Sequence, residues 1–104
     1  MDLEDIRRLC TDETITITKH TFERIRQRGI KYSYIKNTIL NGEIIEQYPD
    51  DYPYPSCLIF AVINDNIYIH VVVGISNDRL YIITAYYPTL EKWEDDYRTR
   101  KAVK

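Results

Sequence analysis

The sequence predicts an α+β domain in which two helices pack against one face of an antiparallel β-sheet of four to five strands. Apolar residues recur at helical spacing before residue 42, whereas alternating or nearly apolar runs dominate residues 43–87. Asn- and Asp-containing segments at residues 64–66 and 77–78 separate the last three runs and suit tight hairpins. A chain of 104 residues is expected to form one domain over residues 1–104.

Helices and a short strand are expected in the N-terminal part. Residues 2–10 form an amphipathic pattern, and residues 14–18 alternate Thr and Ile as a strand does. Thr18 is a candidate cap for the next helix, which ends at Gly29 because glycine readily leaves the helical conformation. A further helix is expected to begin after Lys31 and to be stopped by Asn41-Gly42.

Four strands and a terminal helix are expected after this point. Residues 48–56 contain three prolines, which lack an amide hydrogen, so this segment must be a loop or an edge. The remaining pattern predicts strands over residues 43–47, 57–63, 67–76 and 79–87, which form a C-terminal meander, and a short helix over residues 89–97.

The faces of this sheet depend on the two hairpin turns. If both turns have two residues, His70 lies opposite Ala61 and Ala85, whose small side chains leave a depression beside the imidazole. Tyr87 then shares the face of His70, whereas Tyr86 lies on the more aliphatic face, which should receive the helices. A hydrogen-bonded core histidine fits the same pattern, and a one-residue slip in either turn would reverse the faces.

Three basic side chains recur every fourth residue on the helix after Thr18. His20, Arg24 and Arg28 form one stripe, and Phe22 and Ile25 lie on the far side, where they are expected to anchor the helix to the core. The stripe is a candidate surface for binding phosphate. A solvated helix face would show the same spacing.

Charge is distributed unevenly along the chain. The net charge is -2, which argues against a protein that coats nucleic acid by bulk attraction. Residues 19–36 nevertheless contain six Lys or Arg and only one acidic residue, and a second basic group occupies residues 98–104. A specific anionic partner fits this pattern better than indiscriminate binding.

The sequence also indicates where the protein works. Its longest nearly apolar run, residues 67–75, is about half of what a membrane crossing needs, and the acidic start differs from a secretory signal. We therefore expect a cytoplasmic protein without a membrane partner. Cys10 and Cys57 are far apart in the sequence and are expected to be reduced thiols.

Few chemistries remain open to such a chain. The two histidines and two separated cysteines fit no metal-ligand spacing, and no Gly-rich phosphate loop is present, so we expect neither a metal nor another cofactor. The remaining enzymatic option is metal-free phosphodiester cleavage, which needs a base, an acid and cations on the phosphate. His20 and His70 are the acid and base candidates, Arg24 and Arg28 could hold the phosphate, and the ten tyrosines offer stacking surfaces for bases.

Several short motifs occur together in this chain. They are HxxxRxxxRGI at residues 20–30, NGEIIExYPDD at 41–51, PYPS at 53–56, HVV at 70–72 and TxYxP at 84–88, with Trp93 and Arg100. In combination they resemble the bacterial domain of unknown function 4258 over about residues 16–101.

That family is similar to the RelE/ParE-like toxins of type II toxin–antitoxin systems. The resemblance implies a RelE/barnase-like fold and an endoribonuclease that cleaves mRNA until an antitoxin, sometimes a zinc-finger or other DNA-binding protein, neutralises it. Toxins of this superfamily are commonly basic, whereas this chain is acidic overall. By position, the family's recurring polar residues correspond to His20, Arg24, Arg28, His70, Tyr86 and Arg100.

The sequence thus supports one main hypothesis and two alternatives. The main one is a toxin-like, metal-independent endoribonuclease with His20 and His70 as catalytic residues. RNA or its phosphates would contact Arg24, Arg28, Tyr86, Tyr87 and Arg100. A non-catalytic RNA-binding or protein-interaction module on the same scaffold predicts binding without cleavage, and a passive structural protein predicts neither RNA binding nor growth arrest on expression.

Overall fold

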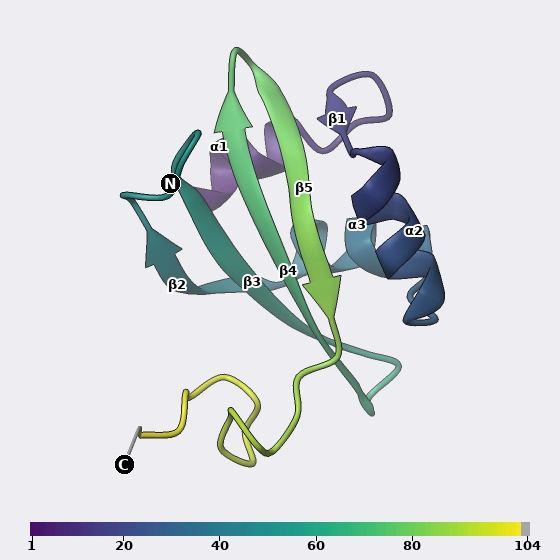
Figure 1. The fold of residues 1–104 in the computed structure, drawn as a ribbon, viewed down its shortest axis with the longest axis vertical. Coiled ribbons are helices and arrows are strands. Elements are labelled where there is room, and N and C mark those ends of the chain that lie inside the picture. Colours follow the sequence, from purple (N-terminus) through teal and green to yellow (C-terminus); the bar gives the residue numbers. More distant parts are fainter. Residues whose placement is uncertain (103–104) are drawn as a thin grey trace.

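A computed structural model describes residues 1–102 of the chain. Three helices and five strands follow one another along it (Figure 1). They are α1 (Leu3–Arg8), β1 (Ile15–Thr16), α2 (Lys19–Gln27), α3 (Tyr32–Asn41), β2 (Glu43–Tyr48), β3 (Ser56–Ile63), β4 (Ile67–Ser76) and β5 (Arg79–Tyr86). Within residues 1–102, no helix is long and apolar enough to cross a membrane.

All five strands belong to one sheet, in the order β1-β5-β4-β3-β2. Strands β2 to β5 form an antiparallel meander, and the short β1 adds to the outer edge of β5 in parallel. The α+β class and the C-terminal meander expected from the sequence are therefore confirmed.

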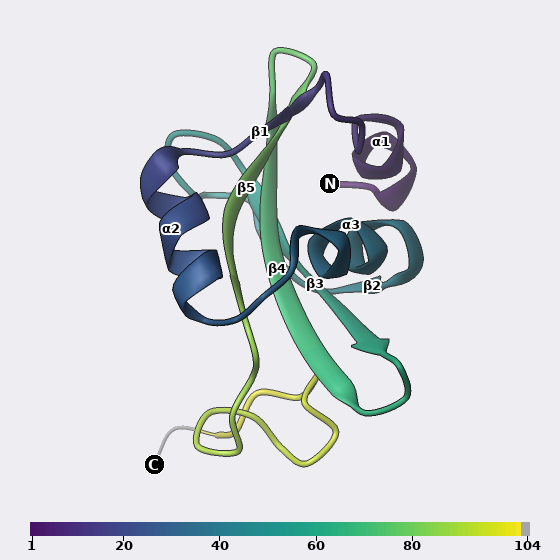
Figure 2. The same ribbon diagram turned by 90° about the vertical axis from the view of Figure 1, so that its right-hand side faces the viewer.

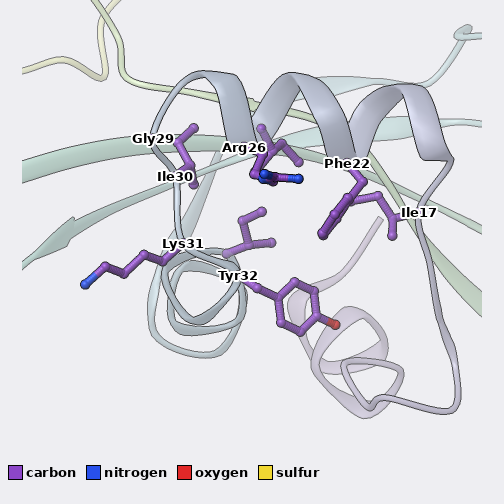
Figure 3. A pocket seen from close by; sticks show the side chains of 9 residues that line it. Ile17, Phe22, Arg26, Gly29, Ile30, Lys31 and Tyr32 are labelled. Atoms are coloured by element: carbon purple, nitrogen blue, oxygen red, sulfur yellow. The ribbon is translucent and has the colours of Figure 1, made fainter.

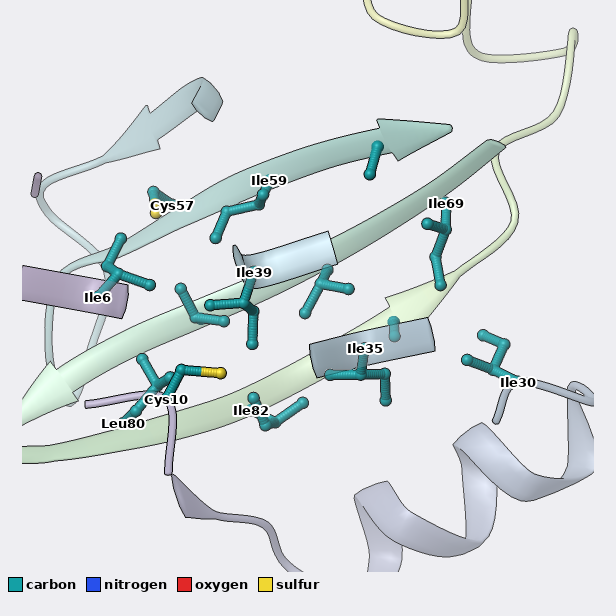
Figure 4. Packing of buried hydrophobic residues seen from close by; sticks show 14 of the residues in the cluster. Ile6, Cys10, Ile30, Ile35, Ile39, Cys57, Ile59, Ile69, Leu80 and Ile82 are labelled. Carbon is teal, nitrogen blue, oxygen red and sulfur yellow. The ribbon is translucent and has the colours of Figure 1, made fainter. Parts of the chain in front are cut away.

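Helices α1 and α3 cover one face of the sheet, and α2 runs along its β5 edge (Figure 2). The core forms where Ile35 and Ile39 of α3, four residues apart, meet Ile59 of β3 and Ile69 of β4 (Figure 4). Ile6 of α1 completes this layer. Because side chains alternate along a strand, neighbouring residues such as Leu58 of β3 and Val72 of β4 lie on the opposite face of the sheet.

Helix α2 begins and ends as the sequence predicts. The Thr18 side chain accepts a hydrogen bond from the Thr21 amide at 3.1 Å, and Gly29 adopts a φ of 71°, which favours glycine. Ile25 is buried in the core, but Phe22 is 46% exposed. The expectation that Phe22 anchors the helix is wrong, because the helix faces the core along the side that carries Ile25.

The β3–β4 hairpin has a longer turn than expected. Ile63 pairs with Ile67, which leaves three turn residues, two of which, Asn64 and Asp65, have positive φ. This one-residue difference places Phe60, not Ala61, opposite His70.

The β4–β5 hairpin has the expected two-residue turn, but a bulge follows it. Ser76 pairs with Arg79, and the register then shifts between Val72 and Val73 because Ile83 is an extra residue in β5. His70 therefore pairs with Tyr86, and the expected neighbour Ala85 faces the helices. His70, Phe60 and Tyr86 share the face that the helices leave uncovered, so the slipped register is the correct alternative.

The terminal helix expected over residues 89–97 is absent, and this segment forms turns. Trp93 makes an isolated bridge with Arg100, and the Asp96 carboxylate accepts hydrogen bonds from the amides of Arg98 and Thr99, both at 2.9 Å. Asp96 thus caps a tight turn, which competes with the helix that the spacing of the apolar residues suggested.

This C-terminal segment covers the sheet face opposite the helices. Trp93 is buried there against Leu58 and Val72. Arg98 forms an ion pair with Glu43 of β2, and Arg100 forms a second ion pair with Glu46 of the same strand. The C-terminal segment therefore forms an outer wall for side chains on this face of the sheet, such as His70.

Candidate functional site

A pocket of about 440 Å³ lies between the end of β5, the end of α2 and the C-terminal segment. It brings together four of the residues predicted from the sequence, which are Arg28, Tyr86, Tyr87 and Arg100. Its other walls come from Pro88, Thr89, Glu91, Lys92 and Trp93. With three cationic side chains and one carboxylate, the lining is net positive. We call this hollow the phosphate pocket, after the ligand that we propose for it.

Arg28 links α2 to the edge of the sheet. Its Nη1 donates to the Ala85 carbonyl at 2.8 Å and to the Thr84 hydroxyl at 3.2 Å, beyond the point where β1 stops pairing with β5. The edge of β5 is thereby capped. Within residues 1–102, the other N–H groups of this guanidinium have no hydrogen-bond partner, so they remain donors for a ligand.

Arg100 is held in a forked ion pair with Glu46. Its Nε and Nη2 donate to the two carboxylate oxygens at 3.1 and 2.9 Å, and its guanidinium lies 4.5 Å from the centre of the Trp93 ring. The hydrogen bonds from Arg100 lower the pKa of Glu46 most, against the opposing effect of burial. Because Glu46 neutralises its charge, Arg100 contributes to the wall of the pocket but adds little positive charge to it.

Arg28 and Lys92 are therefore the more effective cations. Neither forms an ion pair with an acidic side chain of residues 1–102. The carboxylate of Glu91 shares the pocket with them. Within residues 1–102, an anion entering the pocket would therefore meet two cationic side chains that are not held in ion pairs.

Tyr86 is the link between the pocket and His70. The Tyr86 hydroxyl lies 3.3 Å from His70 Nδ1, and His70 Nε2 lies 2.6 Å from the Tyr97 carbonyl. A carbonyl can only accept, so Nε2 carries the hydrogen, and Nδ1 of the neutral ring accepts from Tyr86. Burial lowers the pKa of His70, although the Tyr97 carbonyl and Glu46 partly oppose this, and burial raises the pKa of Tyr86.

His70 itself does not face solvent. Its side chain is 0% exposed, and the rings of Trp93 and Phe60 close around it at centroid distances of 4.5 and 5.8 Å. The expected depression between two alanines is wrong, because the register brings aromatic residues there. In this conformation His70 reaches a ligand only through Tyr86, so we assign it as a positioning residue.

The basic stripe on α2 is only partly included in the phosphate pocket. His20 and Arg24 are exposed, and Arg28 is the member of the stripe that lines the pocket. His20 precedes Arg28 by eight residues, about 12 Å along a helix axis. The placement of His20 and Arg24 fits a solvated helix face.

Three residues near His70 and the pocket were not singled out as site residues from the sequence. Glu91, Lys92 and Tyr97 all fall within the short helix that the sequence predicts over residues 89–97. The turn that brings them to this face depends on Asp96 and on tertiary contacts of Trp93, which leave no periodic signal. Among residues 1–102, no group of three or more His, Cys, Asp or Glu side chains is arranged to hold a metal ion.

A second surface lies between α2 and α3. This apolar groove, about 470 Å³ in volume, is lined mainly by Ile17, Phe22, Ile25, Ile30, Tyr32 and Ile35 (Figure 3). Phe22 extends toward Tyr32 across the space between the helices, and these two side chains are 46% and 37% exposed (Figure 3). Arg26 and Lys31 add positive charge to its lining. Exposed apolar surfaces of this kind are typical of sites that bind another protein.

The fold and the two surfaces define a small α+β domain with a cationic, tyrosine-lined pocket at one end of its sheet. The chain belongs to the family described as Domain of unknown function (DUF4258), whose model matches residues 17–87. This match includes His70, Tyr86 and Tyr87 but ends before Lys92 and Arg100, short of the span to residue 101 that the resemblance indicated. No curated protein matches the chain, and neither does any solved structure.

Proposed function

We propose that the phosphate pocket binds a phosphate of single-stranded RNA and that the protein is a toxin-like, metal-independent endoribonuclease. One observation carries this proposal: Arg28, Lys92 and Tyr86 line one pocket with aromatic walls, and Tyr86 contacts His70 behind it. Guanidinium groups suit phosphate oxygens geometrically, and tyrosine rings stack on unpaired bases.

The chemistry needs a group that exchanges protons with the ribose. Tyr86 is suited to this role, because its oxygen can take the proton of a 2′-hydroxyl while its own proton passes to Nδ1 of His70. The 2′-oxygen would form a bond to phosphorus, the bond from phosphorus to the 5′-oxygen would break, and the leaving 5′-oxygen would take a proton from solvent. Burial lowers the pKa of His70 and so disfavours the imidazolium that forms, and the Tyr97 carbonyl and the Glu46 carboxylate offset part of this effect. Arg28 and Lys92 would stabilise the charge that develops on the phosphate.

Replacing Arg28 with Gln is expected to weaken RNA binding about tenfold, since a charge-assisted contact is worth roughly 1.5 kcal/mol or more. The matched control is Arg24→Gln, which removes the same charge one helical turn away and should change the affinity less than about twofold. Fluorescence anisotropy with a labelled single-stranded RNA in EDTA measures both. Equal losses in the two variants would show that only the overall charge matters, and would overturn the assignment of the pocket.

A second candidate function is protein binding in the apolar groove, and its exposed Phe22 and Tyr32 favour it. We propose that the occupant is an acidic, amphipathic segment of a neutralising partner protein, an antitoxin. The argument is charge complementarity, because Arg26 and Lys31 line the groove and residues 19–36 carry six basic residues against Glu23. Apolar side chains of the partner would enter the groove while its carboxylates face these cations.

The change Phe22→Glu is expected to weaken this complex at least tenfold, because it places a carboxylate in the apolar groove next to an acidic partner. Titration calorimetry with the product of the neighbouring gene measures the affinity. Gln27→Glu is the control, since it adds the same charge to α2 outside the groove lining and should leave the affinity nearly unchanged. Equal effects of both changes, or no binding to the unmodified protein, would contradict the assignment.

A further inference from the structure

A second tyrosine-lined pocket lies beside the phosphate pocket. It has a volume of about 340 Å³, and it shares two of its lining residues, Tyr87 and Pro88, with the phosphate pocket. Its other walls are Tyr68, Tyr97, Ile67 and Asn66. No charged side chain is among these residues, in contrast to the cationic lining of its neighbour.

Tyr97 is held in an unusual backbone conformation. Its φ is 58°, in the left-handed region that bulky side chains rarely adopt. Two contacts maintain this conformation. His70 Nε2 donates to the Tyr97 carbonyl at 2.6 Å, and the Tyr97 ring stacks on Tyr68 with a centroid distance of 4.5 Å and an interplanar angle of 28°. Such conformations cluster at functional sites because the surrounding structure must enforce them.

His70 therefore connects the two pockets. Its Nδ1 contacts Tyr86 in the phosphate pocket, and its Nε2 contacts Tyr97 in the second one. A buried ring with both nitrogens engaged fixes the positions of these two tyrosines relative to each other. The arrangement offers cations in one hollow and flat aromatic surfaces in the next.

We infer that the second pocket is a stacking subsite for one unpaired base of an RNA strand whose adjacent phosphate occupies the phosphate pocket. This inference rests on the proposed function and specifies the ligand. Charged and flat groups alternate along a nucleic acid strand, as they do across these two pockets. The base must be unpaired to stack on tyrosine, and the Asn66 carboxamide can both donate to and accept from its edge.

The test compares two labelled RNA hexamers of equal charge, one with all its bases and one with abasic residues, by fluorescence anisotropy in EDTA. The intact hexamer is expected to bind the unmodified protein about tenfold tighter, because stacking on an aromatic ring strengthens binding by roughly that factor or more. Tyr97→Gly removes the ring while glycine tolerates the positive φ, and it should reduce binding of the intact hexamer to the abasic level. Tyr97→Phe keeps the ring and should bind both hexamers as the unmodified protein does.

The outcomes separate the two proposals. If the unmodified protein binds both hexamers equally and Arg28→Gln weakens both, the base subsite is wrong while the phosphate pocket stands. A loss in Tyr97→Gly that is equal for both hexamers would likewise overturn the base subsite. If the unmodified protein binds neither hexamer, both proposals are wrong.

Discussion

Replacing His70 with Ala is expected to lower the free energy of unfolding by about 3–5 kcal/mol. The imidazole is fully buried among aromatic rings, so its removal leaves a cavity. It also leaves the Tyr97 carbonyl and the Tyr86 hydroxyl without their hydrogen-bond partner. Urea denaturation monitored by Trp93 fluorescence, at a pH above 7, measures the loss.

The other histidine of the chain is the matched control. His20 is exposed on α2, and His20→Ala should change the free energy of unfolding by less than about 0.5 kcal/mol. A decrease in the free energy of unfolding below about 1 kcal/mol for His70→Ala would contradict the positioning role of this residue. Removal of a buried ring with a hydrogen bond at each nitrogen is expected to destabilise the protein by more than that.

The difference in the free energy of unfolding between the unmodified protein and His70→Ala is expected to depend on pH. Burial lowers the pKa of His70 in the folded protein below its ordinary value of 6.5, so the unfolded chain binds its proton first as the pH falls. The stabilisation due to neutral His70 is therefore complete above pH 6.5 and declines as the pH falls from 6.5 through the lowered pKa of the folded state. The unmodified protein and His70→Ala should therefore differ less in their free energy of unfolding as the pH falls over this range.

Changing Tyr86 to Phe is expected to slow RNA cleavage at least about 100-fold, because it removes the hydroxyl that connects this residue of the phosphate pocket with His70. The ring remains, so RNA affinity should change less than about twofold. Tyr87→Phe is the control in the same pocket. The Tyr87 hydroxyl donates to the Gly29 carbonyl at 3.1 Å, so we expect its loss to slow cleavage less than about threefold.

Cleavage is followed with a labelled RNA in EDTA. Equal rates for Tyr86→Phe and the unmodified protein would contradict the proton-exchange role of Tyr86. If the unmodified protein binds RNA in EDTA but does not cleave it, the non-catalytic RNA-binding module is the correct reading of this scaffold.

Local signals in the sequence located most helices and strands. Thr18 and Gly29 mark the start and end of α2, and the Asn77-Asp78 turn joins β4 to β5 as expected. These features are predictable because a cap or a tight turn depends on a few adjacent residues.

The register of the sheet was not predictable in the same way. Three consecutive turn-forming residues at 64–66 are compatible with a two-residue or a three-residue turn, and Ile83 looks like any other strand residue although it forms a bulge. Each shift moves side chains to the other face of the sheet. For this reason His70 lies opposite Phe60 and Tyr86 and not between the two alanines that the sequence suggested.

The candidate site was predictable in its members more than in its geometry. Arg28, Tyr86 and Arg100 were indicated by the resemblance and do meet in one pocket. Lys92 and Tyr97 could not be anticipated, because the turn that carries them follows from long-range contacts of the C-terminal segment with the sheet.

The central claim is that RNA binds at the C-terminal end of β5, between Arg28 and Arg100. A titration of the ¹⁵N-labelled protein with a single-stranded RNA hexamer in EDTA, followed by amide chemical shifts, tests it most directly. We expect the largest shifts at residue 28, residues 86–93 and residue 100. Largest shifts around His20 and Arg24, or no shifts at all, would contradict the account.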